Sequence, residues 1–523
     1  MMSTNNIIVL CAFGFYALIM IAIGFVCSKG TKNNEDYFLG GRNLGSWTAA
    51  ISAEASDMSG WLLMGLPGSI YLAGTGEVWV AIGLLIGTIL NWYIVAARLR
   101  RYTIIANNSL TIPSFLDNRF RSNGVLKLIS AIIIAVFFAV YTASAFSSGA
   151  KLFATLFGTE SNYEKVYFIG LIIAASIILI YTFTGGFKAV CVTDLVQGML
   201  MIVAILSVPI IAYAVLTYNT PLGSALVSQG VENPSTYLNF LHLNGEPIKA
   251  TNIISGLAWG LGYFGMPHII VRFMAIKSER ELKKSRTIAI TWVTLSFIAS
   301  ILIGLVGRAY LTSKLDKATS ETVFIRMIQQ LFDNNWILVF IGGVFLCCIL
   351  AAIMSTADSQ LLVTASAISE DMYKGVINKR ASEKNSLLIG KIAVVFIAVI
   401  AFVIARDPES SIMGLVSNAW AGLGAAFSPL VLFALFWKRT NNAGALAGLI
   451  SGALSIVVWD YIPMINTADG FVTLGTATGL YSLAVGFVIS CLFIVVVSLL
   501  TKKPTDDMIK EFETAKKAQK EIY

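Results

Sequence analysis

Charged residues are scarce in this chain of 523 residues, where Asp, Glu, Lys and Arg together make up 13%. A typical soluble domain carries about 25%. Hydrophobic residues account for 57%, which leaves too little polar surface to cover a soluble globule of this length. The same composition excludes an intrinsically disordered chain, because disorder needs low hydrophobicity and high charge.

Histidine and cysteine are also too few for most metal or redox chemistry. The chain has two His and six Cys, and no two Cys form a CxxC pair. This excludes a Cys/His transition-metal centre, a disulfide framework and a redox motif. No nucleophile–base pair or metal constellation is visible either, so we expect neither an enzyme nor an organic cofactor.

Long apolar runs dominate the sequence, and their number predicts the fold class. A bilayer core about 30 Å thick needs about 20 apolar residues per helix. The first run lacks a basic leader and a cleavage site, so we expect a retained helix. The sequence therefore predicts an all-α polytopic membrane protein with about thirteen spans, at 7–27, 45–73, 77–97, 126–154, 164–184, 190–216, 251–275, 287–309, 336–369, 386–405, 411–436, 442–463 and 478–500.

Positive charges are distributed unevenly between the predicted loops. Of the 37 Lys and Arg, 29 fall on the side that carries the C-terminus and eight on the other side. Cytoplasmic loops carry an excess of Lys and Arg, so we expect the N-terminus outside and the C-terminus in the cytoplasm. The net charge of +8 is thus a topology signal and a contact with anionic lipid headgroups, not the mark of a nucleic-acid partner.

Two spans, 45–73 and 251–275, are polar and interrupted by glycine, as expected for the broken helices that open the inverted repeats of many transporters. Five spans counted from each give repeats at 45–216 and 251–436. The remaining segments are a first peripheral helix with an inner loop at 1–44, an outer loop at 217–250, two peripheral spans at 437–501 and a cytoplasmic tail at 502–523, a candidate mixed-charge helix.

Polar side chains gather in two of the spans. Glu54 and Asp57 lie at membrane depth, where a carboxylate suggests function; a buried, hydrogen-bonded carboxylate is the alternative for each. Ser355 and Thr356 lie in a second polar run, and neutral oxygens suit a monovalent cation. The two runs predict one oxygen-lined cation site, although such hydroxyls also bond to their own helix.

The glycine-rich span at 251–275 carries aromatic residues. Trp259 and Tyr263 are four residues apart, which predicts one helix face that either lines a pocket or packs in the core. His268 follows shortly after. We interpret it as a packing residue, because one other histidine is too few for a proton relay.

Six runs resemble the sodium/solute symporter family, and in particular its proline-transporting branch. The resemblance implies a LeuT-like fold, sodium as coupling ion, L-proline as substrate, a place in the bacterial cytoplasmic membrane and no obligate protein partner. Sodium symport of another small solute, such as another amino acid or a pantothenate-like acid, and a non-transporting proline sensor are the alternatives. The runs are DYFLGGRNLG (36–45), SDMSGWLLMGLPG (56–68), WGLGYFGMPHI (259–269), AAIMSTADSQLLV (351–363), ISEDMYK (368–374) and NAWAGLGAAFSPLVL (418–432).

The resemblance also implies roles for individual residues. The sodium ligands it implies are backbone oxygens of Ala55, Met58 and Ala352 and the hydroxyls of Ser355 and Thr356. The residues implied in sodium affinity and coupling are Asp57, Arg42 and Asp194. The residues implied in substrate binding are Ser59, Trp61, Tyr141, Trp259, Tyr263 and Pro267.

Three positions qualify the resemblance. Arg42 is equally explained as a positively charged loop anchor. Glu54 stands where better-known members carry a small residue, and Met266 replaces a glutamine expected before Pro267. The charge near the sodium site and the hydrogen bonding of the pocket are therefore expected to differ from the family pattern.

Overall fold

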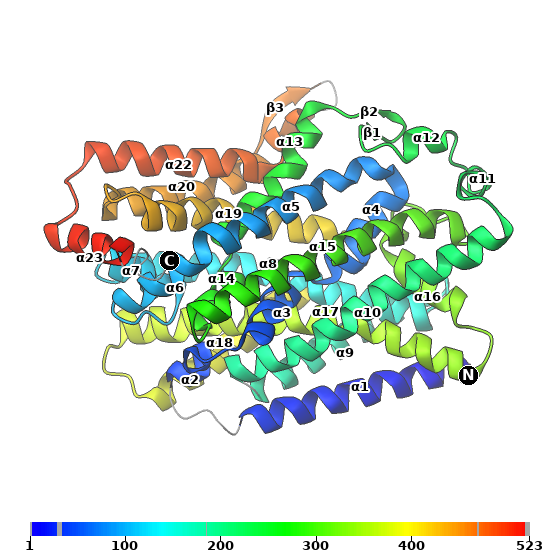
Figure 1. Ribbon diagram of the computed structural model, residues 1–523, viewed down its shortest axis with the longest axis horizontal. Helices are drawn as coiled ribbons and strands as arrows, with labels where there is room; N and C mark the ends of the chain where they lie inside the picture. Colours follow the sequence, from blue (N-terminus) through cyan, green and yellow to red (C-terminus); the bar gives the residue numbers. More distant parts are fainter. Residues whose placement is uncertain (1–2, 29–33, 185, 468–469, 518–523) are drawn as a thin grey trace.

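The helices of this protein run side by side along its long axis (Figure 1). The computed structural model describes residues 3–28, 34–184, 186–467 and 470–517. Among these residues, 11 helices are long and apolar enough to cross a membrane, or 12 with one bent pair. The prediction of an all-α polytopic membrane protein is confirmed. Lys29, Lys32 and Lys520 of the positive-charge count lie outside the described residues.

The continuous spans lie close to their predicted limits. The largest differences are at the start of α15 and the end of α6, where charged residues continue the helix beyond the apolar run. The spans are α1 (Thr4–Ser28), α5 (Val78–Leu90) with the π-helical turn η4 (Asn91–Val95) and α6 (Ala96–Ile105), α8 (Val125–Phe157), α9 (Tyr163–Thr184), α10 (Phe187–Asn219), α15 (Glu279–Tyr310), α17 (Trp336–Ser366), α18 (Glu383–Ile404), α19 (Ile412–Phe436), α20 (Asn442–Tyr461) and α22 (Ser482–Leu500).

The two spans with interrupted sequences are broken. The predicted span 45–73 consists of α3 (Ser46–Asp57), the π-helical turn η2 (Trp61–Gly65) and α4 (Leu66–Ala73). The predicted span 251–275 consists of α13 (Ala250–Ala258), the 3-10 helix η5 (Trp259–Phe264) and α14 (Pro267–Ala275), with a bend of 42°. Thirteen crossings are reached only if both broken segments are counted as spans.

Close packing of glycine positions η5. A Cβ atom added at Gly260 would lie 2.1 Å from the carbonyl oxygen of Gly83 on α5, so no larger residue fits there. The backbone of η5 is satisfied partly from α19, since the indole Nε1 of Trp420 donates to the carbonyl of Trp259 at 2.8 Å. A broken helix is stable in a membrane only where neighbouring groups bond the freed backbone in this way.

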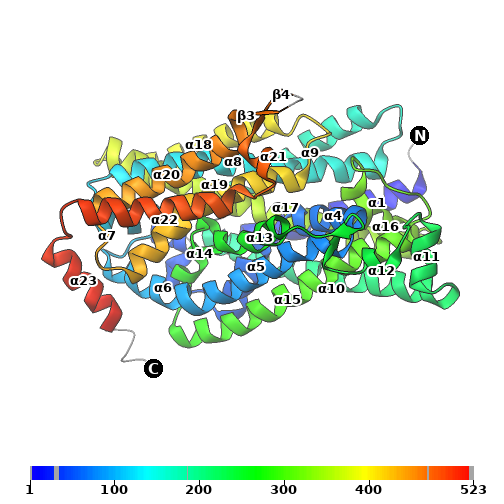
Figure 2. The same cartoon turned by 90° about the horizontal axis from the view of Figure 1, so that it is seen from above.

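Short elements cap the two ends of the bundle, and the hydropathy pattern predicted none of them. At the end that carries α23 (Asp506–Lys517), which we call the α23 end, are α2 (Asn34–Leu39), η1 (Gly40–Arg42), α7 (Ile112–Phe120) and the π-helical η7 (Ala367–Ile377). Away from α23 are η3 (Thr75–Glu77), α11 (Leu222–Ser228), α12 (Pro234–Tyr237), η6 (Ser320–Thr322), α16 (Val323–Leu331), α21 (Leu474–Thr478) and the hairpins β1 (His242–Leu243) with β2 (Glu246–Pro247) and β3 (Pro463–Thr467) with β4 (Gly470–Thr473). Figure 2 shows that the start of α1 and α23 lie at opposite ends.

The C-terminal helix α23 is docked on the bundle. The ring of Phe512 contacts two guanidinium groups, with its centroid 5.2 Å from that of Arg98 and 5.3 Å from that of Arg119. Beside it, Arg121 forms an ion pair with Glu511. The predicted tail helix therefore buries its apolar face against α6 and α7 and is more than a solvated anchor.

Candidate functional site

A hydroxyl group in α17 contacts the last turn of α3, just before the helix break. The Ser355 Oγ atom donates to the carbonyl oxygen of Ala55 at 2.8 Å and lies 3.3 Å from the carbonyl oxygen of Ala352. All three residues are buried. The structure thus brings together three of the five oxygens that the family resemblance implies as sodium ligands.

The other two predicted ligands lie beside this contact in the chain. The Thr356 hydroxyl is buried and has no hydrogen-bond partner among the described residues. Met58 is the first residue beyond the end of α3, with φ −85° and ψ 79°, and is fully buried. The five predicted ligands are neutral oxygens because they are backbone carbonyls and hydroxyls. Within the described residues, no group of three or more His, Cys, Asp or Glu could hold a metal ion.

Four of the predicted substrate residues converge on Asp57. Its carboxylate accepts a hydrogen bond from the Tyr263 hydroxyl at 2.5 Å. Its backbone carbonyl accepts from the Trp61 indole at 2.9 Å and from the Tyr141 hydroxyl at 3.3 Å. The Trp61 amide donates to the Ser59 hydroxyl at 3.4 Å. The second carboxylate oxygen of Asp57 is buried and has no hydrogen-bond partner among the residues that the structure describes, so the cluster keeps one free acceptor there.

Trp259 and Tyr263 do not share a face as predicted. They lie in η5, a 3-10 helix, where residues three apart eclipse and residues four apart diverge by roughly 120°. The Tyr263 ring meets Trp420 edge-on with centroids 5.1 Å apart, whereas the Trp259 ring stacks on Tyr481 at 5.0 Å. The α-helical spacing assumed from the sequence is wrong at this position.

The residues after the break in the second span are buried. Pro267 begins α14 and lines a small cavity with Phe187. The His268 ring lies edge-on to Tyr141 at 6.0 Å, and its role as a packing residue stays a prediction. Met266 is fully buried just before α14, and its effect on hydrogen bonding in the pocket stays a prediction.

Glu54 points to a different neighbour from the sodium oxygens. Its carboxylate accepts from the Trp92 indole of η4 at 2.9 Å, and the Trp92 ring packs on Phe273 at 4.5 Å. Glu54 is 1% exposed. The departure from the family pattern is therefore accommodated by a specific donor on the neighbouring span.

Asp194 lies in a buried network that the sequence did not predict. Its Oδ2 atom accepts from the Ser52 hydroxyl at 2.6 Å and lies 3.3 Å from the guanidinium of Arg272. Arg272 also donates to the Ser359 hydroxyl. Arg272 was counted with the positive charges of the C-terminal side, although it lies within the predicted span 251–275. Its side chain is 1% exposed inside the bundle, because α14 continues past the break.

Arg42 clamps the backbone at the α23 end. Its guanidinium donates to the carbonyls of Met274 and Ser109, each at 2.8 Å, and to the Asn108 side chain at 3.1 Å. Burial lowers the pKa of Arg42 to about 10. These contacts support the loop-anchor interpretation, and they link the loop before α3 to the end of α14.

Sequence reasoning missed four residues that complete the site. Trp420 lies within a family-like run, which was a usable signal. Trp92, Arg272 and Tyr481 carry no local signal, because their partners lie on other spans.

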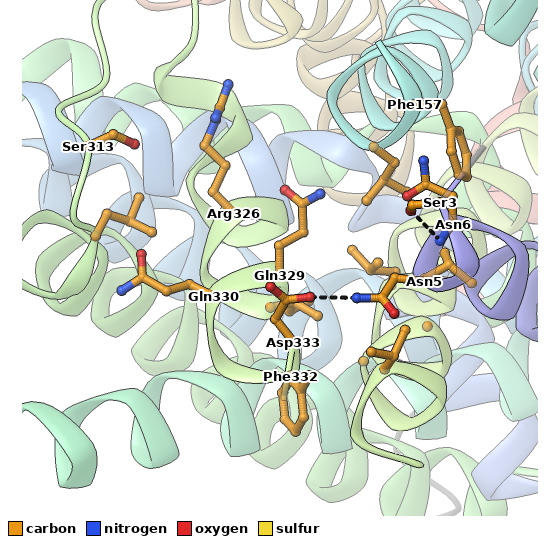
Figure 3. A pocket seen from close by; sticks show the side chains of 18 residues that line it. Ser3, Asn5, Asn6, Phe157, Ser313, Arg326, Gln329, Gln330, Phe332 and Asp333 are labelled. Carbon is orange, nitrogen blue, oxygen red and sulfur yellow. Dashed lines mark hydrogen bonds between the residues drawn. The ribbon is translucent and has the colours of Figure 1, made fainter. Parts of the chain in front are cut away.

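A larger polar cavity lies elsewhere, between the start of α1 and α16 (Figure 3). It has a volume of about 370 Å³, and in it the Asn5 side chain donates to Asp333 at 2.7 Å, while Arg326 lines the wall. None of the predicted site residues lines this cavity. Size alone therefore does not locate the functional site.

Comparisons with known proteins identify the family and the fold. The model of the sodium:solute symporter family matches residues 37–452. A sodium/proline symporter of Staphylococcus aureus is 44% identical over 494 residues, which cover 94% of this chain and 92% of that protein. The sodium/proline symporter of strain NCTC 8325 is also 44% identical, over 495 residues. The structure of a sodium-coupled sialic acid symporter in a substrate-bound outward-open state superposes with a TM-score of 0.71 at 16% identity, covering 96% of this chain and 99% of that chain, and supports the fold alone.

Proposed function

The chain belongs to the sodium:solute symporter family, and from this premise we propose that it takes up L-proline together with sodium by alternating access. The observation that carries the proposal is the contact between α3 and α17, where the Ser355 hydroxyl donates to the carbonyl of Ala55 in the last turn of α3 before the break. The relatives named as sodium/proline symporters support the choice of solute.

The sodium site consists of five neutral oxygens, supplied by the backbone of Ala55, Met58 and Ala352 and by the hydroxyls of Ser355 and Thr356. Neutral oxygens bind a monovalent cation without trapping it. The Thr356 hydroxyl supports this assignment, because a buried hydroxyl without a partner is costly unless a ligand uses it.

The proline pocket adjoins the free carboxylate oxygen of Asp57. Proline needs an apolar wall for its ring and a few polar groups for its charged ends. Trp61, Tyr141 and Tyr263 already surround Asp57, and Ser59 lies in the same turn. The remaining predicted pocket residues, Trp259 and Pro267, lie before and after the break in the second repeat.

Sodium and proline are coupled because both act on the break in α3. An ion held between Ala55 and Ser355 fixes the end of α3, and this orders Asp57 two residues later for the substrate. The coupling is thermodynamic and reciprocal, so proline also strengthens sodium binding. Asp57 supports sodium affinity, Asp194 lies on the inward path of the ion, and Arg42 influences coupling through the loop that precedes α3.

The two broken spans open inverted repeats at 45–216 and 251–436, flanked by the peripheral segments 1–44 and 437–501, the outer loop 217–250 and the tail 502–523. The α23 end faces the cytoplasm, because it carries most of the Lys and Arg. One charge moving down 100 mV supplies about 2.3 kcal/mol, and a tenfold sodium gradient adds about 1.4 kcal/mol. One ion therefore supports roughly 500-fold accumulation of proline.

Uptake by proteoliposomes tests the proposal. With an inward sodium gradient, labelled proline should accumulate, and excess unlabelled proline should block it, whereas glucose, pantothenate and leucine should not. Competition by pantothenate without competition by proline would refute the solute and leave sodium symport intact. Proline binding with no uptake would instead favour the sensor function.

A further inference from the structure

The buried side chain of Arg272 lies one helical turn from the proposed sodium oxygens. Its partner Ser52 precedes Ala55 by three residues on α3, and its partner Ser359 follows Thr356 by three residues on α17. At about 1.5 Å per residue, Arg272 and its partners lie roughly 5 Å from the sodium ligands along each helix axis. Both displacements are toward the α23 end, which is the side from which the ion must leave.

The contacts of Arg272 join four helices. Its Nε atom donates to the Ser52 hydroxyl of α3 at 3.2 Å, and its Nη2 atom pairs with Asp194 of α10 at 3.3 Å. The same Nη2 atom donates to Ser359 of α17, and Nη1 donates to the carbonyl of His268 within α14. The guanidinium therefore closes the space between α3, α10, α14 and α17 just beyond the ion site.

Buried carboxylate oxygens beside Arg272 are available to a second cation. Asp358 lies beside this group, with one carboxylate oxygen 3.3 Å from the Ser359 hydroxyl. One oxygen of Asp194 and one of Asp358 are buried and have no hydrogen-bond partner within the described part of the chain. Among the described residues, Arg272 is the one cation paired with Asp194. A sodium ion moving toward the α23 end meets oxygens that the guanidinium already uses.

We infer that Arg272 is a positioning residue that acts as a tethered competitor of sodium: it holds Asp194 while the inner path is closed, and it prevents the departing ion from settling on that carboxylate. The inference rests on the proposed sodium coupling. Sodium in transit is repelled by the guanidinium and screened from Asp194, so it is released to the cytoplasm instead of being retained in the bundle.

Removing the positive charge of Arg272 and removing the negative charge of Asp194 should have opposite effects on sodium binding. This distinguishes the proposed role from a structural one. Arg272→Gln leaves Asp194 without its ion-pair partner and available to sodium. The sodium concentration that half-saturates the protein should therefore fall roughly tenfold, a change within the range of coupling between two sites. Asp194→Asn leaves the guanidinium unpaired beside the ion, so half-saturation should shift to higher sodium. The double variant should return to within about threefold of wild type, because the two charges act through each other.

The measurement that avoids the substrate is sodium-dependent thermal unfolding of the purified protein without proline. Arg272→Lys, which keeps the charge, should stay near wild type, and Arg308→Gln controls for loss of a buried arginine that lies over Tyr71 instead. In proteoliposomes, Arg272→Gln should slow net uptake but preserve proline exchange at high sodium on both sides, since exchange does not require the ion to leave.

Two results would overturn the inference. One is a sodium dependence that weakens in both single-charge variants, which is the behaviour of a purely structural ion pair. The other is an equal loss of net uptake and exchange in Arg272→Gln. Failure of wild-type protein to take up proline would refute the proposed solute, while the sodium titration would still decide the role of Arg272.

Discussion

Replacing Thr356 by alanine should weaken sodium binding without weakening the ion-free fold. The Thr356 hydroxyl is buried and has no partner among the described residues, so its removal breaks no bond in the protein. Ser355 differs, because its hydroxyl donates to Ala55 at 2.8 Å. Ser355→Ala should therefore lower both sodium affinity and the stability of the ion-free protein.

The magnitudes follow from the partners of each hydroxyl. A polar contact to a charged group contributes about 1.5–3 kcal/mol, so loss of either ligand should raise the half-saturating sodium concentration by roughly 10- to 150-fold. Loss of the Ser355–Ala55 hydrogen bond should also lower the free energy of unfolding by about 0.5–1.5 kcal/mol. For Thr356→Ala that free energy should stay the same or rise, since an unsatisfied buried hydroxyl is removed.

Two titrations on the same purified variants check this reasoning. Thermal unfolding in sodium-free buffer measures the ion-free fold, and uptake against sodium concentration measures the ion. Thr356→Ser, which keeps the hydroxyl, is the matched control and should restore sodium affinity. The reasoning fails if Thr356→Ala destabilises the ion-free protein while its sodium dependence stays at the wild-type value.

Two further substitutions test the surroundings of the site. Glu54→Gln keeps an acceptor for Trp92 but removes the charge, so sodium activation of uptake should weaken. Glu54→Gly should stay active, but it leaves the buried Trp92 N–H unpaired and should lower the free energy of unfolding by about 1–3 kcal/mol in a melting experiment. Wild-type behaviour of both variants would make Glu54 a bystander. Trp259→Ala removes the ring stacked on Tyr481 and should weaken proline binding by about 1–4 kcal/mol in a competition assay, with little change in sodium binding; the exposed Trp336→Ala is the control, and equal loss in both variants would contradict a pocket role.

Hydropathy and glycine spacing predicted the spans and both broken helices, because burial in lipid leaves a signal in every residue of a span. The predicted limits of the spans were wrong where Arg100 and Arg101 extend α6 and where charged residues begin α15, because a helix can continue beyond its apolar run. The 3-10 geometry of η5 was not predictable either. It depends on the contact of Gly260 with Gly83 on another span, and Trp259 and Tyr263 diverge as a result.

The candidate site was predictable only where one segment carried several polar residues. Asp57 and Ser355 stood out because polar groups are rare at membrane depth. Arg272 was counted only as a positive charge of the C-terminal side, and its buried partner is Asp194, 78 positions earlier in the sequence. Such long-range pairings have no periodicity that one sequence can reveal.

The docking of α23 has a practical consequence for shortening or tagging the protein. Phe512 is 3% exposed and contacts the guanidinium groups of Arg98 and Arg119. It therefore anchors α23 to the bundle. Chains cut progressively from the C-terminus should therefore lose some stability when the buried Ala515 is removed and more when Phe512 is removed. Fusion partners should be attached after a spacer beyond Lys517, so that Phe512 stays buried against the bundle.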